Sequence, residues 1–268
     1  MTVRTFVAVG DSFTEGLEDD AGPDGRHRGW ADRVAAALAV VAGRVRYANL
    51  AVRGKLLDQV VADQLPVALA LAPDLVSFHA GPNDVLRPRA DLAALLGRYE
   101  AAVATLRAAD RRTLLFTVIE RTGRGRTADL LAARFAAFNA GVRAVAARHG
   151  AVLVDLGAEP VLADRRLFHP DRLHLAPEGH ARVAAAVLEA LGVADPAITG
   201  GPPGWWRAAV PGDPRASRRT ELVADVRWVR QHLLPWIGRR VRGVSSGDLV
   251  LAKHVDLVDV VAPTPGRG

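Results

Sequence analysis

The sequence predicts an α/β protein with a parallel sheet that is covered by helices on both faces. Short apolar runs rich in β-branched residues alternate with longer stretches in which apolar residues recur at three- and four-residue steps. The chain has 268 residues, of which 50% are hydrophobic, so it can bury a full core without disulfides. Both observations favour a globular domain built from βαβ units.

Five segments have the length and composition of buried strands. The expected strands are residues 5–9, 45–50, 75–80, 113–119 and 152–155. Because they alternate with helical patterns, successive strands are expected to run parallel. We therefore predict a five-stranded parallel sheet.

The segments between and after these strands have the periodicity of helices. The expected helices are residues 30–41, 57–71, 92–109, 129–149 and 177–191. Pro177 suits the first turn of the last helix, because its fixed φ fits that position and its missing N–H would have no partner there. The chain after His174 therefore turns directly into a helix.

The character of the chain changes at residue 200, where Pro and Gly cannot continue a helix. We expect residues 1–199 to form the core domain and residues 200–268 to form a basic, helical C-terminal extension. Four of the five tryptophans lie in this extension: Trp205, Trp206, Trp228 and Trp236.

One face of a helix in the extension would be apolar. Its residues are Leu222, Val226, Val229, Leu233 and Ile237. A basic amphipathic helix with tryptophans can lie on an anionic membrane. We favour the alternative, in which the extension docks on the core domain, near the site described below.

Composition narrows the classes of function. The absence of cysteine excludes thiolate zinc sites and a cysteine nucleophile. The net charge of +6 comes with no groove-reading or base-stacking motif, so we expect no nucleic-acid partner. The apolar run from Phe6 to Val9 is too short for a signal-peptide core, so we expect a cytoplasmic protein.

Ser12 follows the first expected strand directly, within Gly10-Asp11-Ser12. It therefore lies at the carboxyl edge of the sheet, where open α/β folds place their sites. A serine hydroxyl becomes a nucleophile when a base removes its proton. The alternative is that Ser12 is a helix N-cap.

Asp171 and His174 offer the base and a carboxylate to orient it. Their three-residue spacing lets one turn present the Asp171 carboxylate to one imidazole nitrogen while the other nitrogen faces the serine. Taken alone, the segment is better explained as a surface loop with incidental charges.

Two more strand ends supply donors for an oxyanion. Gly54 follows the second strand and can bring its backbone N–H close to a ligand. Asn83 follows the third strand and can donate from its side-chain amide. Each segment alone could be an ordinary turn.

Taken in order, these four blocks resemble those of the SGNH (GDSL-like) hydrolases: Gly10-Asp11-Ser12, an Asn49-to-Gly54 stretch, Gly81-x-Asn83-Asp84, and Asp171-x-x-His174. The resemblance covers about residues 5 to 192. It implies a three-layer α/β/α sandwich with a flavodoxin-like strand arrangement. Pro82 departs from the family pattern and changes the number of donors in its loop.

The resemblance also implies the roles of the residues. Ser12 would be the nucleophile, His174 the general base and then acid, and Asp171 its orienter. The Ser12 N–H, the Gly54 N–H and the Asn83 amide would bind the oxyanion. The reaction would pass through an acyl-Ser12 intermediate without a metal or cofactor.

Other residues near these blocks have two interpretations each. Asp11 and Asp84 are expected to brace the loops, and Asp11 could also line the pocket. His79 could line the pocket or be a hydrogen-bonded structural histidine, and Glu120 could reach the pocket or form an ordinary ion pair. A metal site among His169, His174 and His180 is not favoured, because their spacings match no zinc signature.

We therefore expect a serine esterase that acts on a small-molecule carboxylic ester. The same site would also serve a carbohydrate O-acetyl esterase, a lysophospholipase or a thioesterase. A rival of another class is a binding protein that keeps the fold without activity, with the extension as its working surface; the complete set of four blocks argues against it.

Overall fold

The computed structural model describes residues 2–22, 24–120, 125–212 and 249–262, together with residues 227, 228, 230, 231, 235, 238 and 247. Within this part of the chain, the strands form one sheet in the order β5-β4-β3-β1-β2-β6. Their bounds are β1 (Thr5–Gly10), β2 (Arg44–Asn49), β3 (Leu75–His79), β4 (Arg112–Phe116), β5 (Val152–Val154) and β6 (His254–Val261). The first five strands pair in parallel, as expected, in a flavodoxin-like order.

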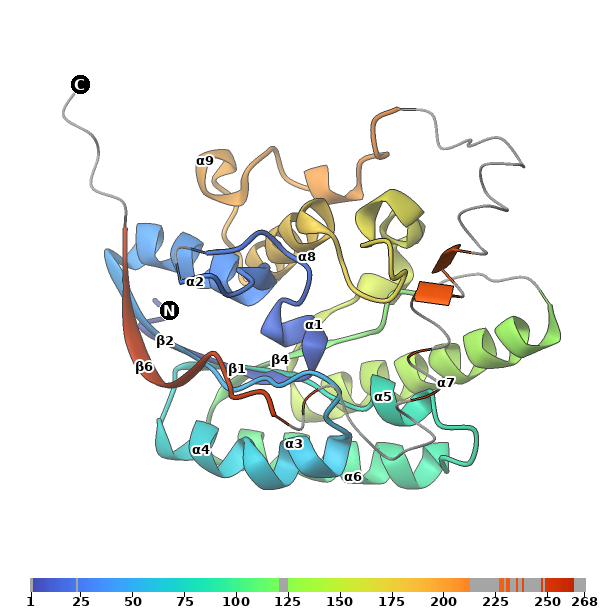
Figure 1. The fold of residues 1–268 in the computed structure, drawn as a ribbon. Coiled ribbons are helices and arrows are strands. Elements are labelled where there is room, and N and C mark those ends of the chain that lie inside the picture. Colours follow the sequence, from blue (N-terminus) through green and yellow to red (C-terminus); the bar gives the residue numbers. More distant parts are fainter. Residues whose placement is uncertain are drawn as a thin grey trace.

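The expected number of five strands is wrong, because the extension contributes a sixth. β6 pairs antiparallel with β2 at the edge of the sheet (Figure 1). Four valines lie among its eight residues, a composition that favours a strand over a helix. Since an unpaired edge offers free N–H and C=O groups, β6 covers the edge that β2 would otherwise expose.

Helices cover both faces of the sheet, so the expected three-layer sandwich is confirmed (Figure 1). One face carries α2 (Gly29–Ala42), α8 (Pro177–Ala190) and α9 (Pro196–Thr199), and the other carries α3 (Leu57–Asp63), α4 (Leu65–Ala70), α5 (Pro82–Val85), α6 (Leu92–Ala108) and α7 (Arg126–His149). The short α1 (Ser12–Glu15) follows β1, and the 3-10 turns η1 (Leu156–Ala158), η2 (Pro160–Ala163) and η3 (Arg165–Leu167) follow β5.

Alternation along β1 builds the two apolar layers. Phe6 and Ala8 pack with residues of α2 and α8, whereas Val7 and Val9 pack with residues of α3, α4, α6 and α7. All four side chains are fully buried. Because side chains of a strand point alternately to opposite faces, this pattern places β1 at the centre of the sandwich.

Two expected elements divide or end earlier than expected. The expected helix at 57–71 is divided at Gln64, because Pro66 lacks the N–H that an uninterrupted helix would use there. The Gln64 side chain turns inward at this point and binds Gly10. The expected fourth strand ends at Phe116, because the side chain of Asn139 hydrogen-bonds both the N–H and the carbonyl of Val118. A buried amide side chain thus binds both backbone groups of one residue in each place, Gly10 and Val118.

The start of the extension packs against α8. Trp206, in the 3-10 turn η4 (Trp205–Arg207), is 4% exposed and donates from Nε1 to Glu189, 3.0 Å away. The division at residue 200 stays a prediction, and the expected helix with Leu222 and Ile237 lies outside the described residues.

Among the described helices, α7 is long and apolar enough to cross a membrane by length and composition alone. Its buried residues Phe138, Val142 and Val145 recur at helical spacing and pack with one apolar layer of the sandwich. This packing is that of an amphipathic helix with one face against the core. The cytoplasmic location stays a prediction.

Candidate active site

The strands bring the four sequence blocks to one edge of the sheet. Ser12 follows β1, Gly54 follows β2, and Asn83 follows β3, and all three strands run in the same direction. β1 lies between β2 and β3, so Ser12 is placed between the two loops that carry Gly54 and Asn83. The carboxyl edge of a parallel sheet is where such folds place their sites.

Ser12 is the first residue of α1, and Asp11 is its N-cap. The Asp11 carboxylate accepts a hydrogen bond from the Phe13 N–H at 3.1 Å, which satisfies an N–H that the short helix leaves without a partner. The N-cap interpretation of Ser12 is therefore wrong. Capping by Asp11 leaves the Ser12 hydroxyl free to face His174.

Asp171 and His174 lie on a hairpin-like turn, residues 168–175, called here the histidine loop. Phe168 and Leu175 form an antiparallel bridge at its base, and the His169 N–H donates to the His174 carbonyl at 2.9 Å. His174 Nδ1 lies 2.6 Å from Asp171 Oδ2, and His174 Nε2 lies 3.2 Å from Ser12 Oγ. Serine, imidazole and carboxylate therefore form one hydrogen-bonded chain.

The electrostatics of Asp171 favour its ionised form. Burial raises the pKa of this carboxyl, but the hydrogen bond and charge of His174 and the N–H groups of Leu173 and His174 outweigh it. Those two N–H groups donate to Oδ1 at 2.8 and 3.0 Å, which leaves Oδ2 for the imidazole. The net result is a lowered pKa, so the carboxylate stays charged beside His174.

Donors for an oxyanion are present beside Ser12. Within the described residues, neither the Ser12 N–H nor the Gly54 N–H donates a hydrogen bond to the protein. Gly54 has φ of +75°, a left-handed conformation that glycine adopts without a Cβ clash. The Asn83 amide donates to Asp11 Oδ2 at 3.2 Å and to the Lys55 carbonyl at 3.0 Å, so its orientation is already set.

Buried polar side chains that the sequence reasoning did not select hold these loops in place. Gln64 is 4% exposed, accepts from the Gly10 N–H at 2.8 Å and donates to the Gly10 carbonyl at 2.9 Å. Glu15 accepts from the Arg53 N–H at 2.7 Å and forms an ion pair with the Arg53 guanidinium. A buried amide between two helices gives no sequence signal of its own, whereas Glu15 lies three residues after Ser12.

Asp84 braces the loop after β3. It is buried and accepts a hydrogen bond from the Leu57 N–H at 2.9 Å, at the start of α3. Burial raises the pKa of Asp84 above its ordinary value, although the Leu57 hydrogen bond opposes this shift. The Asp84 carboxylate thus connects the loop after β3 to the start of α3.

His79 and Glu120 lie near the carboxyl edge of the sheet, but neither belongs to the chain of Ser12, His174 and Asp171. His79 is buried, its ring centroid is 4.3 Å from that of Phe13, and its Nδ1 lies 3.5 Å from Asp11 Oδ1. Glu120 is exposed and accepts from the Asn139 amide at 2.9 Å. A role in a substrate pocket for Asp11, His79 or Glu120 stays a prediction.

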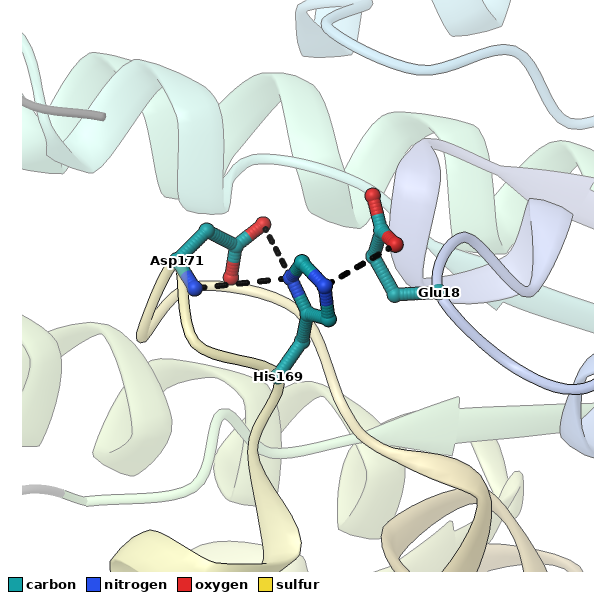
Figure 2. Close-up of side chains that lie close together, drawn as sticks. All are labelled: Glu18, His169 and Asp171. Carbon is teal, nitrogen blue, oxygen red and sulfur yellow. Dashed lines mark hydrogen bonds and ion pairs between the residues drawn. The ribbon is translucent and has the colours of Figure 1, made fainter. Parts of the chain in front are cut away.

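Figure 2 shows the imidazole of His169 between the carboxylates of Glu18 and Asp171. His169 Nε2 lies 3.3 Å from Glu18 Oε2, and His169 Nδ1 lies 3.4 Å from both Asp171 Oδ2 and the Asp171 N–H nitrogen. The Asp171 N–H donates to His169 Nδ1, so the ring contacts both the backbone and the carboxylate of Asp171.

Glu18, His169 and Asp171 are the described residues that lie close enough together to hold a metal ion. The two carboxylates meet different nitrogens of the ring, and Asp171 Oδ2 already accepts from His174. The arrangement is therefore that of a hydrogen-bonded support for Asp171. His180 takes no part in it, because its ring is buried and lies 3.1 Å from the Leu17 carbonyl.

Comparison with known proteins agrees with this geometry. Residues 8–182 match the model of the GDSL-like lipase/acylhydrolase family. No curated protein is similar enough in sequence to count as a match.

Solved structures share the fold. Axe2, an acetylxylan esterase from Geobacillus stearothermophilus, is 20% identical with a TM-score of 0.61, and the match covers 70% of this chain and 94% of Axe2. TesA is 26% identical with a TM-score of 0.58, covering 70% of this chain and 97% of TesA. LAE5, an alpha/beta hydrolase from the metagenome of Lake Arreo in Spain, is 25% identical with a TM-score of 0.59, covering 71% of this chain and 96% of LAE5.

The family model spans well over half of the chain, and its range includes Ser12, Gly54, Asn83, Asp171 and His174. The chain therefore belongs to the GDSL-like lipase/acylhydrolase family and is an ester-hydrolysing enzyme.

Proposed function

We propose that the enzyme hydrolyses carboxylic esters of small or medium acyl groups through a covalent acyl-Ser12 intermediate. The observation that carries this proposal is the chain of contacts from Ser12 Oγ to His174 Nε2 at 3.2 Å and from His174 Nδ1 to Asp171 Oδ2 at 2.6 Å. This is the arrangement in which a base activates a serine and a carboxylate orients the base.

In the acylation step, Ser12 Oγ attacks the ester carbonyl while His174 Nε2 takes the hydroxyl proton. The tetrahedral oxyanion accepts hydrogen bonds from the Ser12 N–H, the Gly54 N–H and the Asn83 amide. His174 then gives its proton to the departing alkoxide oxygen, and the alcohol leaves. Asp171 holds Nδ1–H throughout, which keeps the reactive nitrogen directed at Ser12.

In the deacylation step, water replaces the alcohol. His174 removes a proton from the water, the resulting hydroxyl adds to the acyl carbon, and the same donors bind the second oxyanion. Collapse of this intermediate returns the proton to Ser12 Oγ and releases the carboxylic acid. Both steps use side chains and backbone N–H groups of this chain, together with one water molecule.

Within this chemistry, a carbohydrate O-acetyl esterase, a lysophospholipase and a thioesterase are the alternative substrate classes. A panel of p-nitrophenyl esters of increasing acyl length, tested beside acetylated sugars, lysophospholipids and acyl thioesters, separates them. A preference for the shortest acyl groups supports the small-ester proposal. A preference for long acyl chains overturns it in favour of a lipid substrate.

The covalent step has its own test. We expect a fluorophosphonate probe to label the wild-type protein and not the Ser12→Ala variant. Ser77→Ala is the matched control, because Ser77 is buried in β3 and should leave labelling unchanged. A folded wild-type protein that resists labelling, or a labelled Ser12→Ala variant, would favour the rival interpretation of an inactive binding protein.

A further inference from the structure

The C-terminal extension contacts the histidine loop through Trp228. The indole Nε1 donates a hydrogen bond of 2.6 Å to the backbone carbonyl of Asp171. The indole is half-buried in this position. A residue far along the chain thus binds the peptide group of the triad carboxylate itself.

The same indole contacts the next residue of the loop. The guanidinium carbon of Arg172 lies 4.9 Å from the centroid of the Trp228 ring, within the range of a cation–π contact. Arg172 has φ of +61°, a left-handed conformation that a residue with a side chain adopts only where its surroundings impose it. Trp228 therefore holds the loop at the point where its backbone is strained.

A second part of the extension approaches the opposite side of the site. Gly247 is buried against the loop after β2, and a Cβ at this position would lie 2.0 Å from the Arg53 carbonyl oxygen. Arg53 directly precedes Gly54, the expected oxyanion donor. Described residues of the extension thus reach the loops on both sides of Ser12.

These contacts lie outside the shared family domain. The family model ends at residue 182, and the match to TesA covers 97% of that protein but only 70% of this chain. The extension therefore adds to a domain that relatives complete without it.

We infer that Trp228 is a positioning residue for the triad, acting through Asp171. Its hydrogen bond fixes the peptide group between Asp171 and Arg172, and this peptide sets the direction of the Asp171 carboxylate. Asp171 Oδ2 in turn holds His174, so loss of the indole N–H loosens the imidazole without removing a group that touches substrate. The inference rests on the proposed role of the triad.

The test compares two tryptophans of the extension. Trp228→Phe keeps an aromatic ring over Arg172 and removes the N–H. The matched control is Trp205→Phe, because Trp205 Nε1 also donates to a backbone carbonyl, that of Thr199 at 2.9 Å, away from the triad. Each full-length variant is assayed for kcat/KM on p-nitrophenyl acetate over a range of pH, for its rate of fluorophosphonate labelling, and for Tm.

We expect Trp228→Phe to lower kcat/KM and the labelling rate by about three- to tenfold, the range set by loss of one hydrogen bond. The acid limb of its pH profile should move to lower pH, because a less firmly held Asp171 favours protonation of His174 less. Trp205→Phe should leave both the rate and the pH profile unchanged. A merely structural role would lower Tm without moving the pH profile.

A second variant tests the loop without altering the extension. Arg172→Met removes the cation over the indole and should lower kcat/KM in the same direction by a smaller factor. The inference is overturned if Trp228→Phe matches the wild type in rate and pH profile, or if Trp205→Phe has an equal effect. Wild-type labelling separates the two proposals, because an unlabelled wild type contradicts the serine mechanism itself.

Discussion

On one side of the site, the loops that carry Ser12, Gly54 and Asn83 follow their strands directly and are held by buried amides. Gln64 and Asn49 are at most 4% exposed and bind loop or neighbouring backbone. On the other side, the histidine loop follows β5 only after three 3-10 turns, and Leu173 at its tip is 51% exposed. Its supports are its own N–H groups, His169 and Trp228.

The two sides of the site are therefore held in place by different kinds of contact. The serine side is fixed by the sheet, so its donors are ready before substrate arrives, as oxyanion stabilisation requires. The histidine side is fixed by a few contacts at one turn, so its geometry depends on individual side chains. Substitutions on the two sides should therefore differ in whether they change reactivity alone or reactivity and stability together.

The largest effect is expected on the histidine side, at Asp171→Asn. The Asn amide would place the hydrogen of His174 on Nε2, the nitrogen that must accept the Ser12 proton, so kcat should fall by about 10⁴-fold. Steady-state kinetics on a p-nitrophenyl ester measures this loss. Asp164→Asn is the control, because Asp164 pairs with Arg166 outside the triad. A loss of less than tenfold in Asp171→Asn would contradict the assigned role.

On the serine side, Asn83→Ala should lower kcat by about 10²- to 10³-fold, the usual cost of one oxyanion donor. KM should change little, because the lost interaction forms with the charge of the transition state. The variant also loses the contacts to Asp11 and Lys55, so thermal melting must be measured beside the kinetics. An unchanged kcat in a variant with a lowered Tm would make Asn83 a structural residue only.

The sequence could predict some residues of this site and not others. Ser12, Gly54 and Asn83 could be predicted because each directly follows a strand with a clear apolar pattern. Asp171 and His174 could be predicted because their spacing fits one turn and because their block, together with the other three, resembles those of the SGNH hydrolases. Gln64, His169 and Trp228 could not, since each acts on a backbone or side chain that is distant in sequence or made available only by the folded loop.

The fold was predictable to a similar extent. The parallel strands and their helices follow from hydrophobic periodicity, which depends on local spacing. β6 was missed because an edge strand needs a partner that lies more than 200 residues earlier in the chain. Its valines carry a local signal, but the amphipathic pattern from Leu222 to Ile237 predicts a helical extension instead.

His180 joins the two sides, since it lies on α8 after the histidine loop and contacts the Leu17 carbonyl after α1. Burial lowers the pKa of His180 from 6.5 to about 4. The unfolded chain therefore binds the proton more readily, and the contribution of His180 to stability is present above pH 6.5 and lost as pH falls toward 4. The loss amounts to about 3 kcal/mol.

The measurement is the free energy of unfolding of wild type and His180→Gln at pH 7 and pH 4. The difference between them is needed because Asp32 acts in the opposite direction: burial raises its pKa to about 6, so its contribution to stability falls as pH rises. From pH 7 to pH 4, the free energy of unfolding of His180→Gln should rise relative to that of the wild type. Parallel losses in the two proteins would show that His180 does not titrate as proposed.

The smallest effect is expected at Gln64→Leu, and it distinguishes the two sides most directly. The substitution leaves the Gly10 N–H buried without a partner, whereas the Gly10 carbonyl still accepts from Val52 at 3.3 Å. One orphaned N–H should cost about 1–3 kcal/mol of unfolding free energy. Gln59→Leu in α3 is the control for an amide near the surface: it frees the Leu56 N–H, which is exposed and can bind water, so its cost should be smaller.

Because Gly10 lies two residues before Ser12, the loss of stability in Gln64→Leu should come with a lower kcat and an unchanged acid limb of the pH profile. Trp228→Phe should give the reverse combination, a shifted acid limb with little change in stability. If both variants changed the pH profile alike, the two sides would share one support, and the division between a sheet-fixed serine side and a contact-fixed histidine side would fail.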